Sequence, residues 1–70
     1  MEKFNIEIKD EYITLSQFLK LADLIMTGGE AKWYLEDNSV YVNDEREKRR
    51  GRKLYKGDHV QVDAKEYIID

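Results

Sequence analysis

The chain begins with alternating apolar and polar residues and then changes to a helical period. Residues 4–8 read Phe-Asn-Ile-Glu-Ile, the pattern of a half-buried strand. From Leu15 onward the apolar residues recur at helical spacing, and Thr14 with Gln17 forms a capping box in front of them. We expect a helix that begins near Leu15, ends at Thr27-Gly28-Gly29, and buries one face made of Leu15, Phe18, Leu19, Ala22, Ile25 and Met26.

Two further leucines of this expected helix, Leu21 and Leu24, fall outside that face. A helix that is apolar on two sides is usually covered on two sides. We expect the N-terminal strand, or another added element, to pack on the second side. A partner protein could cover it instead.

A second helix is predicted from about residue 28 to residue 36. Thr27 and Glu30 have the spacing of another capping box, around two glycines. The helical period predicts that Ala31, Tyr34 and Leu35 are buried and that Lys32 and Trp33 face outward.

Alternation returns after this helix. The expected strands are residues 40–42, 50–55, 59–62 and 67–69, with turns at residues 43–45 and 56–58. The last strand can pair with the first. The order of elements predicts an α+β domain over residues 1–70, in which two short helices pack on a small antiparallel sheet with added N- and C-terminal strands.

Composition excludes several classes of protein. The 70 residues include no cysteine, so disulfides and thiolate metal cages are excluded. The polar N-terminus does not resemble a signal peptide, and no apolar run approaches the roughly 20 residues of a membrane span. We therefore expect a cytoplasmic, soluble protein without a membrane partner.

Catalytic residues are also scarce. Nucleophilic catalysis needs an activated side chain beside a base. His59 is the one histidine and lies beside a predicted turn, and the two serines, Ser16 and Ser39, each lie beside a predicted helix end. The carboxylates do not lie in apolar stretches that would raise their pKa for acid–base work. Metal-ligand spacing is absent as well. We expect no enzyme activity, no cofactor, no metal and no small-molecule substrate.

The charge is concentrated in one segment. Residues 46–53, Arg-Glu-Lys-Arg-Arg-Gly-Arg-Lys, hold six of the twelve basic residues and one of the fifteen acidic ones, a formal charge of +5. The remaining chain carries −8, and the total is −3. Because salt screens surface charges beyond about 8–10 Å, a local basic patch can bind a polyanion even in an acidic protein.

Arginine predominates in this segment, and its planar guanidinium group can donate two hydrogen bonds to the oxygens of one phosphate. In an extended return strand Arg50 and Arg52 would point to one side, and Arg49 and Lys53 to the other. The preceding Arg46-Glu47-Lys48 is expected to be a solvated turn. The pattern favours polyanion binding over a solvated run of charges.

The segment Thr27-Gly28-Gly29-Glu30-Ala31-Lys32 admits two interpretations. Glycines at a helix start would let the backbone N–H groups approach a phosphate, with Lys32 one turn away. A tight turn between two helices explains the same residues. Trp33 also admits two interpretations. It could stack on a nucleobase, or it could lie half-buried against a loop.

Taken together, the order of these features resembles the S-four (αL) RNA-binding domain, over residues 13 to 62. The segments that carry the resemblance, and that look like the short stand-alone YaaA-like members, are Gln17-Phe18-Leu19-Lys20-Leu21-Ala22, Gly28-Gly29-x-Ala31-Lys32, Val40-x-Val42-Asn43 and Arg49-Arg50-Gly51-Arg52-Lys53-Leu54. The chain departs from the family at Leu15-Ser16-Gln17, where Arg-Leu-Asp is frequent, at Gly29, where an arginine is frequent, and at Asp44, where glycine is usual. Its helix pair is therefore less basic than in the wider family.

The resemblance implies an RNA-facing surface on the helix pair and the following strand and loop. Carried over by position, its residues are Gln17, Lys20, Lys32, Asn43, Arg49, Arg50, Arg52 and Lys53. To these we add the backbone of Gly28 and Gly29, which would hold a phosphate at the helix start together with Lys32. The resemblance also implies a non-catalytic protein that contacts structured RNA, with ribosomal RNA during ribosome assembly or maturation as the expected target.

A different function fits the same residues. In a protein-interaction adaptor the basic segment would dock on an acidic partner, and Leu21 and Leu24 would supply an apolar patch. DNA is a less suitable target, because the helix that Gly28-Gly29 opens is too short to read a major groove.

Overall fold

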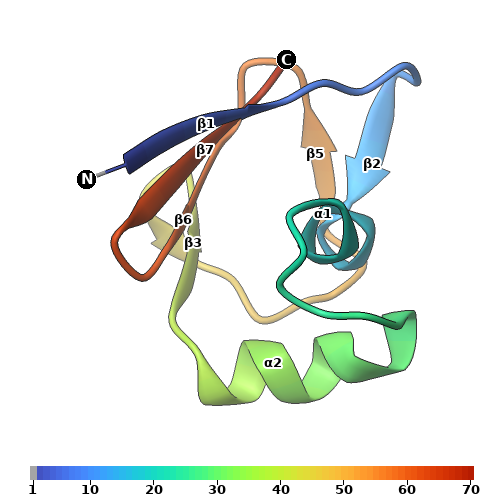
Figure 1. The fold of residues 1–70 in the computed structure, drawn as a ribbon, viewed down its shortest axis with the longest axis vertical. Helices are drawn as coiled ribbons and strands as arrows, with labels where there is room; N and C mark the ends of the chain where they lie inside the picture. Colours follow the sequence, from blue (N-terminus) through green and yellow to red (C-terminus); the bar gives the residue numbers. More distant parts are fainter. Residues whose placement is uncertain (1) are drawn as a thin grey trace.

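The computed structural model describes residues 2–70, which contain a five-stranded sheet, a two-stranded ribbon and two short α-helices (Figure 1). In order across the sheet the strands are β1 (Glu2–Ile6), β7 (Lys65–Ile69), β6 (His59–Val62), β3 (Val40–Val42) and β4 (Glu45–Arg46). The ribbon consists of β2 (Tyr12–Thr14) and β5 (Lys53–Tyr55). The helical elements are α1 (Leu15–Leu21), the 3₁₀ turn η1 (Gly28–Glu30) and α2 (Ala31–Asp37).

The predicted α+β class is confirmed, with one difference in the sheet. The first and last strands do pair, but β1 and β7 run parallel, with Phe4 opposite Tyr67. The other pairs of this sheet are antiparallel, so the sheet is mixed. Parallel neighbours need a long connection, and here the rest of the described chain lies between the two strands.

The start of α1 is as predicted. The Thr14 backbone N–H donates to Gln17 Oε1 at 2.9 Å, and the Gln17 backbone N–H donates to Thr14 Oγ1 at 3.2 Å. The helix therefore begins with the capping box that the sequence indicated.

The predicted end of this helix is wrong, because α1 ends at Leu21. Asp23 adopts a left-handed conformation with φ of 60°. The Leu24 N–H then donates to the Leu19 carbonyl at 2.9 Å, and the Asp23 N–H to the Lys20 carbonyl at 3.0 Å. These are the two bonds of a Schellman motif, which stops a helix.

Residues beyond this motif leave the helical register. Ile25 lies in the segment that connects the two helices, and its side chain is buried in the core. Met26, which was also expected in the core, is 87% exposed. Leu24 is partly buried against the core, and Leu21 remains 58% exposed. The expected second helical face therefore does not exist as one surface.

The second helix also begins differently from the prediction. Residues 28–30 form a 3₁₀ turn, and α2 starts at Ala31. Thr27 and Glu30 contact each other through their side chains at 3.4 Å, but neither caps a backbone N–H, so there is no second capping box. Ala31 and Leu35 are buried as predicted.

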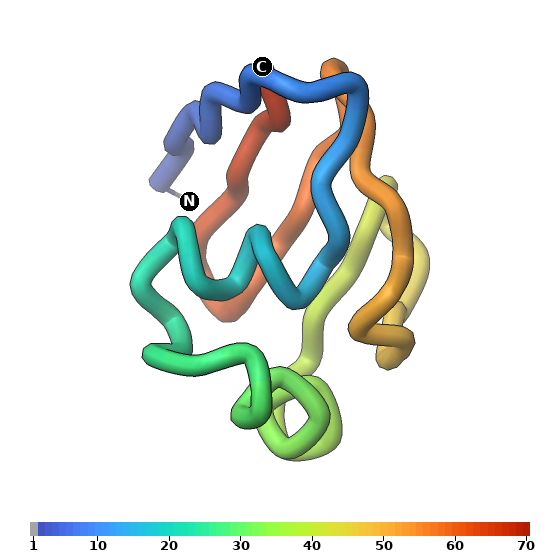
Figure 2. Tube along the Cα trace, turned by 90° about the vertical axis from the view of Figure 1, so that its right-hand side faces the viewer, coloured from blue at the N-terminus to red at the C-terminus, as the bar shows by residue number. Residues whose placement is uncertain are grey.

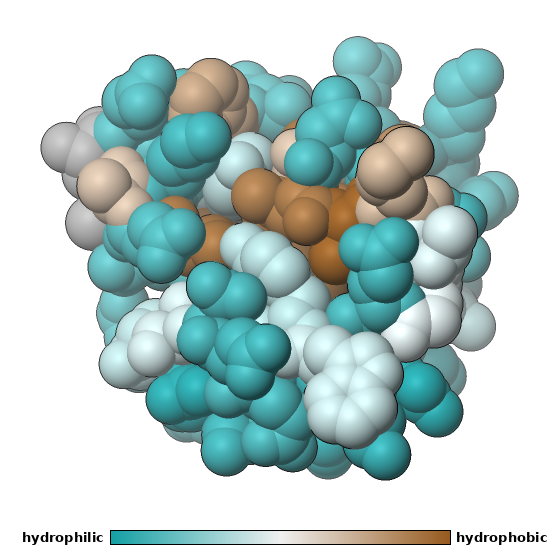
Figure 3. All heavy atoms as spheres, turned by 60° about the horizontal axis from the view of Figure 1, so that its bottom comes forward, coloured by the Kyte–Doolittle hydropathy of each residue, from teal (hydrophilic) through white to brown (hydrophobic). Residues whose placement is uncertain are grey.

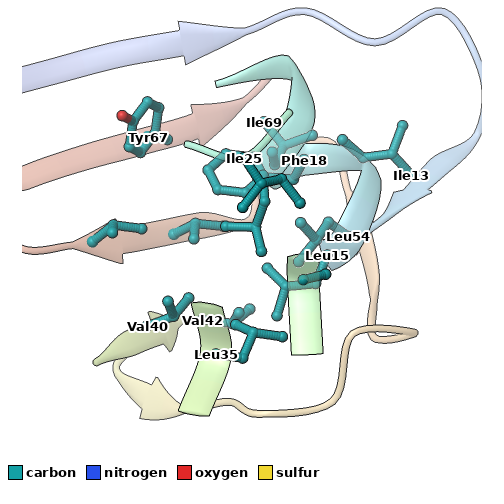
Figure 4. Packing of buried hydrophobic residues seen from close by; sticks show 14 of the residues in the cluster. Ile13, Leu15, Phe18, Ile25, Leu35, Val40, Val42, Leu54, Tyr67 and Ile69 are labelled. Carbon is teal, nitrogen blue, oxygen red and sulfur yellow. The ribbon is translucent and has the colours of Figure 1, made fainter. Parts of the chain in front are cut away.

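The core lies between the sheet, the ribbon and the two helices (Figure 4). Phe18 of α1 is fully buried, and its ring meets that of Tyr67 edge to face, with centroids 5.1 Å apart. The largest fully buried aliphatic side chains of the cluster are Leu15, Leu19, Leu35, Val40, Val42, Leu54, Val60, Val62 and Ile69.

The return strand predicted over residues 50–55 is wrong in extent. The chain reverses at Asn43 and Asp44, whose φ values of 50° and 72° fit a two-residue hairpin turn, and β4 follows directly. Residues 47–52 then form a loop, and β5 pairs with β2 rather than with the main sheet. Arg50 and Arg52 therefore do not project from one face of a strand.

Across residues 2–70, none of the helices has the length and apolar character needed to cross a membrane. In the same residues, no three His, Cys, Asp or Glu side chains gather as metal ligands would.

Candidate nucleic-acid interface

The loop of residues 47–52, here called the basic loop, is organised around one buried carboxylate. Glu47 is 6% exposed, and its Oε1 accepts from Arg49 Nη2 at 3.0 Å and from Arg52 Nη1 at 2.8 Å. Its Oε2 accepts from Arg49 Nε and from the backbone N–H groups of Lys48 and Arg49, each at 3.1 Å. The expectation that residues 46–48 form a solvated turn is therefore wrong for Glu47.

These bonds keep Glu47 ionised. The hydrogen bonds from Arg49 are the largest cause that lowers the pKa of Glu47, from 4.5 to about 2, and Arg52 adds to them. Burial acts in the opposite direction, because it disfavours the charged form. The same bonds raise the pKa of Arg49.

The basic loop is also bound to the first turn of α1. The Leu15 N–H donates to the Arg52 carbonyl at 2.8 Å, and the Ser16 N–H donates to the Arg50 carbonyl at 2.9 Å. The N-terminal N–H groups of a helix lack partners within the helix, so these loop carbonyls satisfy two of them. The loop is thereby held against α1.

Arg50 and Lys53 are exposed beside this junction. Within residues 2–70 neither has an acidic side chain within ion-pair distance. Lys53 lies opposite Thr14 in the ribbon, and its Nζ is 4.9 Å from the centroid of the Tyr12 ring. These two cations differ from Arg49 and Arg52, which share Glu47.

The exposed side of α1 continues the surface. Gln17 and Lys20 line a shallow hollow of about 260 Å³ together with Ile13 and Leu21. Lys20 is exposed, and no acidic partner lies within ion-pair distance of it among the described residues. In Figure 3 apolar atoms gather in the middle of the face that carries α2, with polar residues around them.

Gly28 and Gly29 belong to η1, the segment that leads from α1 into α2 (Figure 2). A Cβ added at Gly28 would meet Ser16 Oγ at 3.9 Å, which is ordinary contact. Neither glycine has a positive φ. The fold therefore does not require glycine at these positions, and the backbone of η1 is open to an approaching molecule.

Lys32 is exposed on α2, as predicted, and its Nζ lies 5.6 Å from the ring centroid of Trp33. Trp33 is 65% exposed, so its side chain is not covered by a loop.

Asn43 is separated from the other predicted residues. Asn43 directly follows the last residue of β3. The basic loop contacts the other end of this strand, where the Val40 carbonyl accepts from the Glu47 N–H at 2.9 Å. Asn43 Oδ1 accepts from the His59 N–H at 2.9 Å, and Asn43 Nδ2 donates to Asp58 Oδ1 at 3.2 Å. The side chain thus ties two turns together.

The structure therefore gathers most of the predicted residues around α1. Gln17, Gly28, Arg50 and Lys53 lie near its first turn, with Gly29 next to Gly28, and Lys20 lies in its last turn. Lys32 lies on the next helix, and Arg49 and Arg52 are held by Glu47. The prediction from sequence missed Glu47 itself. The signal available for it was a single acid within a run of cations.

Comparisons with known proteins identify the family of the chain. A family model described as S4 domain matches residues 6–70. A protein of Bacillus subtilis (strain 168), named probable ribosome maturation protein RlbA, is 60% identical over 59 residues, which cover 84% of this chain and 83% of that protein.

Proposed function

The chain belongs to the S4 domain family, and on that premise we propose that it is a non-catalytic, cytoplasmic protein that binds structured RNA, with ribosomal RNA during ribosome maturation as its target. The relative named as a probable ribosome maturation protein supports the ribosomal part of this proposal.

The observation that carries the proposal is the cationic face around α1. Although the chain has a net charge of −3, Arg50 and Lys53 beside the first turn of α1 and Lys20 in its last turn have no acidic partner among residues 2–70. Such a face attracts a polyanion locally, because acidic groups elsewhere are screened.

Each residue of the face has a role in this proposal. Arg50, Lys53, Lys20 and Lys32 contact phosphates. Arg49 and Arg52 add the N–H groups that Glu47 leaves unused, since a guanidinium carries five donors. Such contacts position an RNA without reading its sequence.

The remaining residues supply contacts other than charge. The Gln17 amide, beside the hollow on α1, is within reach of a base edge or a 2′-hydroxyl. Gly28 and Gly29 allow the RNA backbone to approach η1 closely. Asn43 lies apart from this face, and one of its amide hydrogens remains for a separate contact with a 2′-hydroxyl. Side chains cannot read the deep groove of A-form RNA, so recognition of shape suits this compact face.

The test is RNA affinity measured against salt concentration, with a fluorescein-labelled RNA hairpin and with isolated ribosomal subunits. Four phosphate contacts predict a slope of log affinity on log salt between about −3 and −4, taking about 0.7–0.9 per phosphate. Arg50→Ala combined with Lys53→Ala should weaken binding and reduce the magnitude of the slope by about two.

The matched control is Lys3→Ala combined with Lys65→Ala, which removes the same charge from β1 and β7. Equal effects of the two double variants would show that net charge alone attracts RNA. That result would contradict the proposal that RNA binds at the cationic face around α1. A flat salt dependence would contradict the electrostatic mechanism. Partners that remain bound after nuclease treatment would favour the protein-interaction adaptor instead.

A further inference from the structure

The ribbon of β2 and β5 exposes two tyrosines that the proposed phosphate contacts do not use. Ile13 and Leu54 are a cross-strand pair and are buried. Because side chains alternate along a strand, the neighbouring pair, Tyr12 and Tyr55, lies on the outer face. These side chains are 38% and 43% exposed, with ring centroids 5.8 Å apart and planes inclined by 49°.

A cation lies on the same face as these rings. Lys53 is two residues from Tyr55 on β5, and its Nζ is 4.9 Å from the centroid of the Tyr12 ring. The contact holds the ammonium group over one tyrosine while Lys53 remains exposed. An aromatic surface and a phosphate-binding cation are therefore adjacent.

The ribbon is continuous with the cationic face around α1. Thr14 is both the last residue of β2 and the N-cap of α1. The Arg52 carbonyl, directly before β5, accepts from the Leu15 N–H at 2.8 Å. A strand of RNA that leaves the basic loop along β5 reaches Lys53 first and the tyrosines next.

Two acidic residues, Asp58 and Glu11, lie near this path, and Asp58 is held in place by hydrogen bonds. Both oxygens of Asp58 are engaged: Oδ2 accepts from the Tyr55 N–H at 2.8 Å and Oδ1 from Asn43 Nδ2 at 3.2 Å. Glu11 precedes Tyr12, and Lys56 follows Tyr55. Flat apolar rings beside a cation match a nucleotide, whose base stacks and whose phosphate is negative.

We infer that Tyr12 and Tyr55 form a stacking site for an unpaired nucleobase, with Lys53 contacting the phosphate of the same nucleotide. The inference rests on the proposed RNA-binding function and extends it: the RNA bound at the basic loop carries a single-stranded nucleotide next to its helical part.

The test uses three fluorescein-labelled RNA hairpins: one without a tail, one with a short adenine tail, and one with an abasic tail of equal phosphate number. For the wild-type chain the adenine tail should bind about 5- to 150-fold more tightly than the abasic tail for each stacked base. Tyr12→Leu combined with Tyr55→Leu should abolish this preference, while Tyr12→Phe combined with Tyr55→Phe should retain it.

The chain offers a matched control in Phe4, which is 39% exposed and has the Nζ of Lys65 at 6.0 Å from its ring centroid, on a different sheet. Phe4→Leu should keep the preference for the adenine tail. A fluorescent adenine analogue in the tail gives a second readout without any variant, since stacking on tyrosine quenches it.

The possible outcomes distinguish a failure of the stacking site from a failure of the proposed RNA-binding function. Failure of the wild-type chain to bind even the hairpin without a tail would overturn the proposed function. Binding of that hairpin with equal affinity for adenine and abasic tails, or with no quenching of the analogue, would overturn the stacking site alone. Retention of the preference by the double leucine variant would do the same.

Discussion

Replacing Glu47 by glutamine removes one negative charge from the centre of the basic loop while keeping the shape of the side chain. The wild-type carboxylate accepts five hydrogen bonds, two at Oε1 and three at Oε2. The amide nitrogen that replaces one oxygen cannot accept, so at least two of these bonds are lost in either orientation.

The magnitude follows from the pKa of Glu47, which is about 2 against an ordinary value of 4.5. At about 1.4 kcal/mol per unit of pKa, the folded state favours the ionised group by about 3 kcal/mol. A domain of this length has a total stability of about 4–10 kcal/mol. We therefore expect Glu47→Gln to lower the free energy of unfolding by about 2–3 kcal/mol at neutral pH, measured by urea denaturation.

The control is Glu36→Gln, which removes the same charge from a surface pair. Glu36 Oε2 and Lys48 Nζ are 3.9 Å apart, with side chains 56% and 55% exposed, and such pairs contribute about 0–1 kcal/mol. Its effect on the free energy of unfolding should therefore be small.

The pH dependence has a defined sign. Because the folded-state pKa of Glu47 is lowered, its stabilisation is complete above pH 4.5 and is lost as the pH falls toward about 2. The difference between the wild type and Glu47→Gln should shrink across that window. Equal stability of the two chains at neutral pH, or a difference independent of pH, would refute the role assigned to Glu47.

The remaining predictions concern two backbone positions. Gly28→Ala should leave the free energy of unfolding nearly unchanged, because the added Cβ meets only Ser16 Oγ at 3.9 Å. Its RNA affinity should fall, because the added methyl group keeps the RNA backbone away from η1. Unchanged RNA affinity would contradict the proposed contact at Gly28. Asp23→Gly should raise stability by about 0.5–1 kcal/mol in thermal unfolding, because glycine adopts the φ of 60° without strain; a decrease would contradict the helix-stop assignment.

Local chemistry made part of this fold predictable. The capping box at Thr14 and Gln17 and the alternation at residues 40–42 and 59–62 each depend on neighbouring residues, and each appears as predicted. The pairing of the last strand with the first was predicted too, but its direction was not. Direction depends on the path of the whole chain rather than on either segment.

The end of α1 could not be read from its pattern. The helical spacing of apolar residues continues to Met26, and an aspartate, not a glycine, occupies the left-handed position at residue 23. Asp23 carries no strong helix-stop signal, because aspartate is tolerated at positive φ but not characteristic of it. Ile25 nevertheless reaches the core from the connecting segment, so its hydrophobicity was informative about burial and misleading about the helix.

In the candidate site, the sequence predicted the charge but not the arrangement of the charged side chains. The run of cations in residues 46–53 was evident from sequence, but their arrangement depends on Glu47, whose burial comes from tertiary packing. If all six cations met phosphates, the salt slope from this segment alone would approach about −5.

Because Glu47 binds Arg49 and Arg52, fewer cations are free to exchange counterions with RNA, and the slope should be shallower. The internal pair of arginines then contributes to the shape of the loop more than to its attraction for RNA. Glu47→Gln tests this: it makes the chain more positive, so binding governed by charge would strengthen. Binding governed by the geometry of the loop should weaken instead.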